Sequence, residues 1–175
     1  TYPMAVTSAG AILSYVKDTQ FSDLPHLRPP SLLVKAKTMT LDAVTLRNLE
    51  IVKTIGDSSK DTLFAVLNKT STAGGSRKLK DWLLRPLHDL DKLNQRHDAV
   101  QELFDNTLSR REIKDILKGF QDVERLLSRL GHGSISPRDL DSLKTSLNTL
   151  KDLKQFLSEE PLKSKLMKLL VKSID

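Results

Sequence analysis

The sequence predicts an all-α protein: a multi-helix bundle with long lever helices toward its C-terminal end and at most one short strand or β-ribbon, near residues 32–41. Two observations predict this class. Apolar residues recur at spacings of three and four along most of the chain. Aromatic residues make up only 5% and charged residues 29%, a balance that suits helices with wide solvated faces. The length of 175 residues fits one domain.

The N-terminal part should contain a helix followed by a linker. Residues 1–22 are expected to form the first helix, since Pro3 suits a first helical turn and apolar residues follow at helical spacing. Residues 23–41 begin with prolines that exclude a continuing helix. They end in the only segment, 32–41, whose side chains alternate as in a strand. One strand cannot form a sheet alone, so we expect a ribbon at an edge or a strand paired outside this chain.

Residues 42–132 are predicted to form a helical hub. Asp42 is placed to cap its first helix, because a carboxylate accepts the free N–H groups of a first turn. That helix should continue through Val52 to a stop at Gly56, since glycine commonly follows a helix C-terminus. Asp61 should cap the next, short helix.

The polar stretch Thr70–Gly75 should separate that short helix from one that carries Trp82 and stops at Pro86. Gly74 and Gly75, followed by a serine and two basic residues, suggest a phosphate-binding loop. The spacing differs from GxxxxGK[ST], however, and no buried strand precedes the loop. The two glycines are better explained as a point where two backbones pass closely, and the tryptophan as a wedge between helices.

Asp89 should begin a longer helix with an apolar stripe facing a partner helix. Five residues at spacings of three and four form the stripe: Leu90, Leu93, His97, Val100 and Phe104. We expect His97 to be partly buried there. A short helix over Arg110–Lys118 and a longer one from Phe120 to Leu130 follow, and a Gly-His-Gly sequence should end the second.

Residues 134–175 are predicted to begin the lever helices. Ser134 or Ser136 should cap the first, with Pro137 near its first position and Asp139 in its first turn, where the helix dipole favours a carboxylate. Leucines then recur at helical spacing for about five turns, which makes this the longest uninterrupted helix that the sequence predicts. A terminal helix should restart at Pro161.

The net charge is +6, and most of the excess lies between Lys144 and Lys172. A basic domain is one sign of nucleic-acid binding. The basic region nevertheless lacks interleaved aromatic residues for base stacking and an arginine cluster for phosphate binding. We favour a solvated helical surface; the alternative is weak contact with the DNA backbone by Lys163, Lys165 and Lys168.

The residues indicate no catalytic, cofactor-binding or metal site. The chain has no cysteine, which excludes disulfides and thiolate metal ligands and fits a reducing compartment. Its four histidines lie singly, without an HExxH pattern. Acidic pairs lie two apart, so their side chains would point in different directions on a helix, and no serine has a GxSxG setting. No apolar run approaches the roughly 20 residues of a membrane-spanning helix, and no signal-peptide pattern opens the sequence.

Five motifs occur in order between Leu41 and Leu140: LDxxTxRNLE, TLxxxLxxTxTxxGxRxLxxWLxxPL, NxRxDAVxEL, LxxxxDxERLLSRL and PRDL. Together they resemble the core, or lever, domain (domain III) of the MutS family of DNA mismatch repair proteins. A chance match would have to reproduce all five motifs at compatible distances.

The resemblance implies structural roles for eight hub residues: Arg47, Asn48, Glu50, Gly75, Arg77, Trp82, Pro86 and Arg96. It also implies that Pro137, Arg138 and Asp139 form the start of the lever. It implies no catalytic or mismatch-contacting residue, because the family's Phe-x-Glu and Walker motifs do not occur in this sequence.

By the same resemblance, the chain would be one part of a longer protein, without the connector, clamp, mismatch-binding and ATPase domains. It would relay the nucleotide state of the ATPase domain to the DNA clamp. It would have no cofactor of its own, since ATP and Mg²⁺ would bind in the ATPase domain.

The implied partners are mismatched duplex DNA, bound by the full-length protein, the other domains of the same chain and a dimer partner, but no membrane. The expected location is the cytoplasm of a prokaryote, in association with the nucleoid. The alternative function is a free-standing basic helical module that binds nucleic acid or a protein partner.

Overall fold

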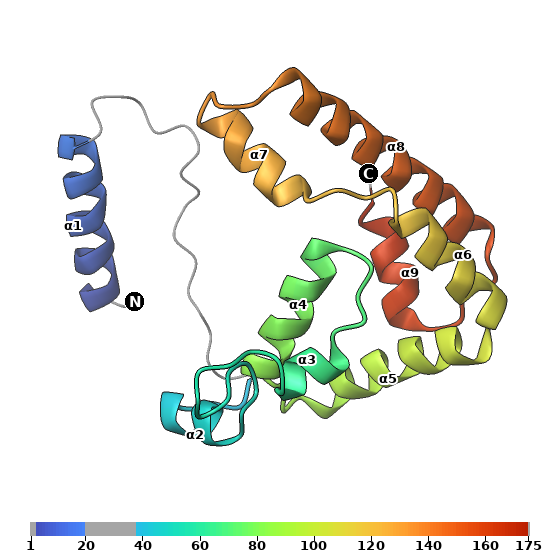
Figure 1. Ribbon diagram of the computed structural model, residues 1–175, viewed down its shortest axis with the longest axis horizontal. Helices are drawn as coiled ribbons and strands as arrows, with labels where there is room; N and C mark the ends of the chain where they lie inside the picture. The colour runs from blue at the N-terminus through green and yellow to red at the C-terminus, as the bar shows by residue number, and fades with distance from the viewer. Residues whose placement is uncertain (1–2, 20–37, 175) are drawn as a thin grey trace. The chain divides into compact units, whose positions relative to one another are not determined.

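The computed structural model describes residues 3–19 and 38–174, and the regular elements in these ranges are α-helices (Figure 1). The all-α prediction is therefore confirmed. The chain divides into an N-terminal unit and a larger unit that begins at Lys35. The N-terminal unit contains α1 (Pro3–Thr19), which confirms the first predicted helix over these residues. The predicted proline-rich linker lies mostly outside the described residues.

The predicted strand also lies partly outside the described residues, which resume at Thr38. Thr38 forms an isolated antiparallel bridge with Leu87. The Met39 N–H donates to the carbonyl oxygen of Pro86 at 2.7 Å. The described part of the expected ribbon is thus a single bridge, which joins this segment to the turn after α4 (Ala73–Leu84).

α2 (Ala43–Asn48) begins where predicted, since the Asp42 side chain accepts a hydrogen bond from the Thr45 N–H. The prediction that it continues to Gly56 is wrong. Glu50 has a φ of 48°, which takes the backbone out of the helical path. The Glu50 carbonyl then accepts the N–H of Leu63, so the chain turns toward the next helix.

α3 (Leu63–Leu67) is capped by Thr62 and not, as predicted, by Asp61. The Thr62 side chain is buried and its oxygen accepts the Ala65 N–H at 3.2 Å. Threonine and aspartate are both good caps, so their order along the sequence left the choice open.

The glycines before the tryptophan helix lie inside it, because Thr72 caps α4 and both Gly74 and Gly75 fall in the first turn. A Cβ at Gly74 would meet nothing within 4 Å, whereas one at Gly75 would lie 3.0 Å from the Thr72 hydroxyl. The predicted close passage of two backbones is therefore wrong, and the crowding at Gly75 comes from the capping side chain. α4 ends before Pro86, as predicted.

α5 (Leu90–Asp105) is capped by Asp89 as predicted, but its packed face is not the predicted one. Val100 and Phe104 are 66% and 68% exposed, and His97 is exposed as well. Ala99 is buried instead, in one cluster with Leu157 and Met167. The small alanine side chain lets α9 (Lys165–Lys172) approach closely, and this contact decides which face of α5 is covered.

The remaining helices are α6 (Thr107–Leu117), α7 (Val123–Gly131) and α8 (Pro137–Glu159). Figure 1 shows α6 and α7 beside successive parts of α8, in agreement with the contacts between these helices. With 23 residues, α8 is the longest helix in the described ranges, as predicted. α7 is shorter than α6, contrary to the prediction, because Asp122 caps it and the residues before Asp122 form a turn.

Two helix starts in the C-terminal part bear on the lever prediction. Ser136 caps α8, and Pro137 occupies its first turn, which confirms the second of the two serines proposed. α9 is capped by Ser164, so the prediction that this helix starts at Pro161 is wrong. Pro161 belongs to the extended turn that joins α8 to α9.

The buried apolar cluster lies where α5, α8 and α9 meet. Around Ala99, Leu157 and Met167 it gathers partly buried side chains, among them Leu103, Leu153 and Leu166. The division into a hub over 42–132 and lever helices from 134 onward stays a prediction.

Candidate functional site

The polar contacts that best match the predicted roles lie at the two ends of α7. At its N-terminal end, Arg77 of α4 donates to both carboxylate oxygens of Asp122, at 2.9 and 2.7 Å. Arg77 also lies 2.6 Å from Glu124. Asp122 caps α7 by accepting the Arg125 N–H at 3.3 Å. One carboxylate therefore both starts α7 and joins it to α4.

The contact between Arg77 and Asp122 favours the charged form of both side chains. The hydrogen bond from Arg77 lowers the pKa of Asp122 below its usual range, against the opposing effect of burial. The same hydrogen bond raises the pKa of Arg77. A two-point arginine–carboxylate contact also restricts orientation, because both groups are planar and fit in one geometry.

At its C-terminal end, α7 is joined to the start of α8. Arg129 donates to Asp139 at 2.8 Å. Asp139 also accepts the Ser136 N–H at 3.0 Å, while the Asp139 N–H donates to the Ser136 hydroxyl at 3.1 Å. This reciprocal capping box, with the Ser136 N–H as its main contribution, holds the pKa of Asp139 below its usual range. The Asp139 side chain is 17% exposed, so Arg129 reaches it in a partly desolvated setting.

We call the four residues Arg77, Asp122, Arg129 and Asp139 the α7 linkage. Two of them, Arg77 and Asp139, are among the residues for which the sequence predicted a role, and the structure connects them through α7. Sequence reasoning missed the other two. A signal was present, because both belong to the motif LxxxxDxERLLSRL, which served only as a family marker.

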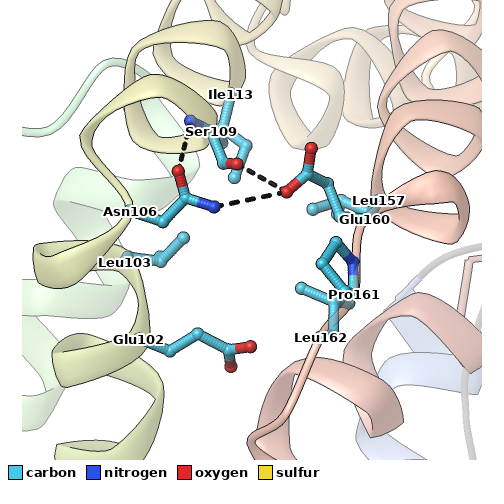
Figure 2. Close-up of a pocket in the computed structure, with 9 residues that line it drawn as sticks. All are labelled: Glu102, Leu103, Asn106, Ser109, Ile113, Leu157, Glu160, Pro161 and Leu162. Carbon is cyan, nitrogen blue, oxygen red and sulfur yellow. Dashed lines mark hydrogen bonds between the residues drawn. The ribbon is translucent and has the colours of Figure 1, made fainter.

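A second joint connects α5 and α6 to the turn between α8 and α9, and Figure 2 shows its residues around a small hollow. Glu160, which follows α8, accepts the Ser109 hydroxyl of α6 at 2.5 Å. Figure 2 also shows Asn106 pointing to the same carboxylate, at 3.4 Å. A glutamate thus holds the start of α6 to the end of α8.

A second glutamate adds to this joint from the other partner, since it lies on α5 and contacts the start of α9. Glu102 of α5 accepts the backbone N–H groups of Lys163 and Ser164 at the start of α9, the latter at 2.9 Å. Burial disfavours the charged form of Glu102, but the hydrogen bonds from Ser164 and Lys163 outweigh it and lower the pKa of this carboxyl. A carboxylate at a helix N-terminus is also favoured by the helix dipole.

Trp82 and Arg96 form a third contact, between α4 and α5. The guanidinium carbon of Arg96 lies 3.7 Å from the centre of the Trp82 ring, a cation–π geometry. Burial lowers the pKa of Arg96. Trp82 itself is 38% exposed, so it covers Arg96 with one ring face and keeps part of its surface in solvent.

The other predicted residues lie apart from these joints. The Glu50 carboxylate accepts the Ile55 N–H at 2.9 Å. Arg47 and Asn48 are exposed on α2, and their side chains form no hydrogen bond or ion pair with another described residue. Arg138 is exposed beside Asp139, and the lysines proposed for DNA contact, Lys163, Lys165 and Lys168, are exposed too. The structural roles assigned to these residues stay predictions.

Two kinds of site raised by the sequence can be checked among the described residues, a metal cluster and a phosphate-binding loop at Gly74 and Gly75. Between 3 and 19 and between 38 and 174, no group of three His, Cys, Asp or Glu residues could hold a metal. The N–H of Gly75 is used by the Thr72 cap, so the first turn of α4 does not form a phosphate-binding loop. No helix in these ranges is long and apolar enough to cross a membrane.

Comparison with known proteins gives one consistent family. The family model for MutS domain III matches residues 44–175. A DNA mismatch repair protein MutS from Methanosarcina acetivorans is 44% identical over 157 residues, which cover 89% of this chain and 17% of the relative. The MutS protein of Caldanaerobacter subterraneus is 40% identical over 171 residues, 97% of this chain and 19% of the relative.

A third relative, the MutS protein of Halothermothrix orenii, is 40% identical over 174 residues, 99% of this chain and 19% of the relative. The chain therefore spans less than a fifth of the length of these curated relatives.

Proposed function

Because the chain belongs to the MutS domain III family, we propose that it is the hub and lever of a DNA mismatch repair protein and transmits conformational change between other parts of that protein. In this proposal the intact protein binds mismatched duplex DNA and hydrolyses ATP, acts with a dimer partner, and carries these sites outside the present chain. Hydrolysis of ATP, bound together with Mg²⁺, would supply the energy for the change. In this proposal the residues of this chain take no part in that chemistry.

The α7 linkage is the observation that carries the proposal. It connects α4 to α7 through Arg77 and Asp122, and α7 to α8 through Arg129 and Asp139. Asp122 caps α7, and Asp139 completes the capping box of α8, so a displacement of either arginine acts on the first turn of a helix. A rotation of α4 would therefore be passed to the base of α8.

The length of α8 supports the lever part of the proposal. A helix of 23 residues rises about 35 Å, so a small rotation at its first turn becomes a displacement of several ångströms at its far end. The α7 linkage provides a physical route between two elements, but only a measured change in coupling distinguishes a route from mere contact.

The test uses the intact mismatch repair protein with Arg129→Ala, which removes the joint to α8, and Arg111→Ala as a matched control. Arg111 is an exposed arginine of α6 that forms no ion pair with a described residue. We expect Arg129→Ala to lower the stimulation of ATP hydrolysis by mismatched DNA several-fold, while ATP hydrolysis without DNA changes little. Arg111→Ala should leave both rates near those of the unmodified protein.

A second variant acts on the lever itself. Leu147→Pro interrupts α8 near its middle, and because Leu147 is largely exposed, the effect comes from the break in the helix and not from loss of the leucine side chain. Like Arg129→Ala, it should uncouple DNA binding from ATP turnover and so lower the stimulation of ATP hydrolysis by mismatched DNA. If both variants keep normal DNA-stimulated hydrolysis, this chain does not act as a relay.

One observation favours a second function, weak DNA-backbone contact. Lys165, Lys168 and Lys172 follow at spacings of three and four, so they share one side of α9, and all three are exposed. Such a row of lysines could contact phosphates without reading bases.

A further inference from the structure

A hollow of about 670 Å³ lies between α2, the loop that follows it and α4, all within the larger unit. Five apolar side chains line it: Ala43, Leu46, Val52, Ile55 and Leu84. Ile55 is 63% exposed and also lines a second hollow beside α2. The two hollows share Ala43, Arg47 and Ile55, so they adjoin one another in one partly apolar surface.

The rim of this surface, which we call the α2–α4 groove, is basic. Arg47, Lys53 and Lys80 line it, against the single carboxylate of Asp57. Lys53 pairs with Asp57 at 3.0 Å and lowers the pKa of that carboxyl. Arg47 and Lys80 form no ion pair with another described residue. The charge of Arg47 also contributes to the lowered pKa of Asp57, so the described rim keeps a net positive charge, carried by Arg47 and Lys80, that can interact with a ligand.

The loop wall of the groove has a defined shape. Thr54 donates its N–H to the Ser58 carbonyl at 2.7 Å, and the Thr54 hydroxyl accepts the Ser58 N–H at 3.0 Å. The Glu50 carboxylate holds the Ile55 N–H at 2.9 Å. A wall that is ordered before binding reduces the entropy lost when a ligand docks.

We propose that the α2–α4 groove is a docking site for an acidic amphipathic peptide segment of a partner protein, with apolar side chains on its floor and carboxylates against Arg47 and Lys80. The floor accounts for the apolar face of such a segment and the rim for its acidic flank. A second copy of this chain is a poorer occupant, because its net charge is +6. A DNA backbone would satisfy the rim but leave the apolar floor exposed to water. The proposal does not rest on the relay through α7.

The test measures binding of a fluorescein-labelled synthetic peptide of leucine, phenylalanine and glutamate in a helical amphipathic pattern to the 175-residue chain, by fluorescence anisotropy. The same peptide with lysine in place of glutamate is the probe control. We expect the acidic peptide to bind and the basic peptide to bind at least about tenfold more weakly, because the rim selects the sign of charge. Equal binding of the two peptides would overturn the proposal, and so would no binding of either.

Variants locate the site. Arg47→Glu with Lys80→Glu should weaken binding of the acidic peptide about tenfold or more, since both charges reverse. Lys144→Glu with Lys151→Glu changes the net charge by the same amount on α8 and should change binding less than about twofold. Ile55→Ser should weaken binding through the floor alone. Unfolding curves verify that each variant folds.

Competition with duplex DNA tests whether the groove binds DNA and not an acidic peptide. If a short duplex binds the chain, loses affinity with Arg47→Glu/Lys80→Glu and displaces the acidic peptide at lower concentration than the peptide itself binds, the groove is a DNA contact and the proposal is wrong. If the duplex leaves the peptide bound, the proposal stands.

Discussion

Gly119 follows α6, where the chain turns against the buried side of α8. A Cβ at this position would lie 2.9 Å from the Thr149 hydroxyl oxygen and 3.6 Å from the Ile116 carbonyl. Thr149 is buried, and its hydroxyl donates to Thr145 at 3.0 Å, so it cannot turn aside without breaking a hydrogen bond. Close approach, and not a special φ, explains the glycine.

We expect Gly119→Ala to lower the free energy of unfolding by about 1–3 kcal/mol, because the added methyl group overpacks the contact with α8. Combined with Thr149→Ala, which removes the opposing hydroxyl, the same change should cost less than it does alone. A double-mutant cycle by urea unfolding measures this coupling. Additive effects of the two substitutions would show that Gly119 is not held by Thr149.

Glu102 makes stability depend on pH in a stated direction. Its pKa is lower in the folded chain than the ordinary value of 4.5, so the folded state binds this proton more weakly than the unfolded state does. The stabilisation is therefore complete above pH 4.5 and is lost as the pH falls through the folded pKa. Other carboxyls, such as Asp122 and Asp139, act in the same direction.

Comparison with Glu102→Gln isolates the contribution of this one carboxylate. The variant should lose roughly 1 kcal/mol of unfolding free energy at neutral pH, because an amide accepts the α9 N–H groups less strongly than a carboxylate does. The gap between the two proteins should close on acidification below pH 4.5. Urea unfolding across a pH series measures it, and a gap that stays constant would mean that Glu102 does not stabilise α9 through its charge.

Three helix starts were predicted correctly, because a cap is a local feature of the sequence. Asp42, Asp89 and Ser136 were predicted and are observed, since each precedes a helix with the side chain that accepts first-turn N–H groups. The face that a helix buries was harder to predict. The stripe through Val100 and the face through Ala99 are neighbours on α5, and only the contact with α9 decides between them.

Features fixed by distant residues could not be predicted. The early end of α2 depends on the hydrogen bond from Leu63 to the Glu50 carbonyl, across the intervening loop. Of the α7 linkage, only the outer residues Arg77 and Asp139 were given a role from sequence, although the family motifs contain all four residues. Its pairing of Arg77 with Asp122 joins residues 45 positions apart, a partnership that no local spacing indicates.

The cap of α8 gives a prediction at the scale of one helix. Ser136→Ala removes the hydroxyl of the capping box and should lower the free energy of unfolding by about 1 kcal/mol. Ser134→Ala is the matched control, because its hydroxyl makes only a long hydrogen bond of 3.4 Å to the Arg129 carbonyl. Thermal and urea unfolding compare the two. Equal losses would indicate that α8 does not depend on this cap for its start.

Within the larger unit, the buried apolar cluster and the polar contacts of α4 involve different residues. The cluster of Ala99, Leu157 and Met167 belongs to α5, α8 and α9, whereas α4 is joined to the later helices through Arg77 and Arg96, at the surface. A surface ion pair is weaker and more sensitive to salt than apolar burial. High salt should therefore weaken the joint between α4 and α7 before it affects the cluster.

The charge of the whole chain supplies the last prediction, on duplex DNA. With a net charge of +6 and the row Lys165, Lys168 and Lys172 on α9, the chain should bind a labelled duplex weakly at low salt. It should bind matched and mismatched duplexes equally, because these lysines can contact phosphates but offer no arrangement that reads bases. Near physiological salt, binding should fall below detection.

Replacing Lys165 and Lys168 by alanine should reduce the slope of log affinity against log salt by up to about two, since each lysine neutralises one phosphate and each neutralised phosphate adds roughly one unit to the slope. Lys92→Ala with Lys114→Ala, on α5 and α6, lowers the net charge equally. If DNA contacts the lysine row of α9, this control should change the slope less; if only the total charge of the chain matters, both double variants should change it equally. A salt series of binding curves distinguishes the two. Preference for the mismatched duplex would contradict the assignment of this chain as a hub and lever, because mismatch reading would then lie in the chain itself.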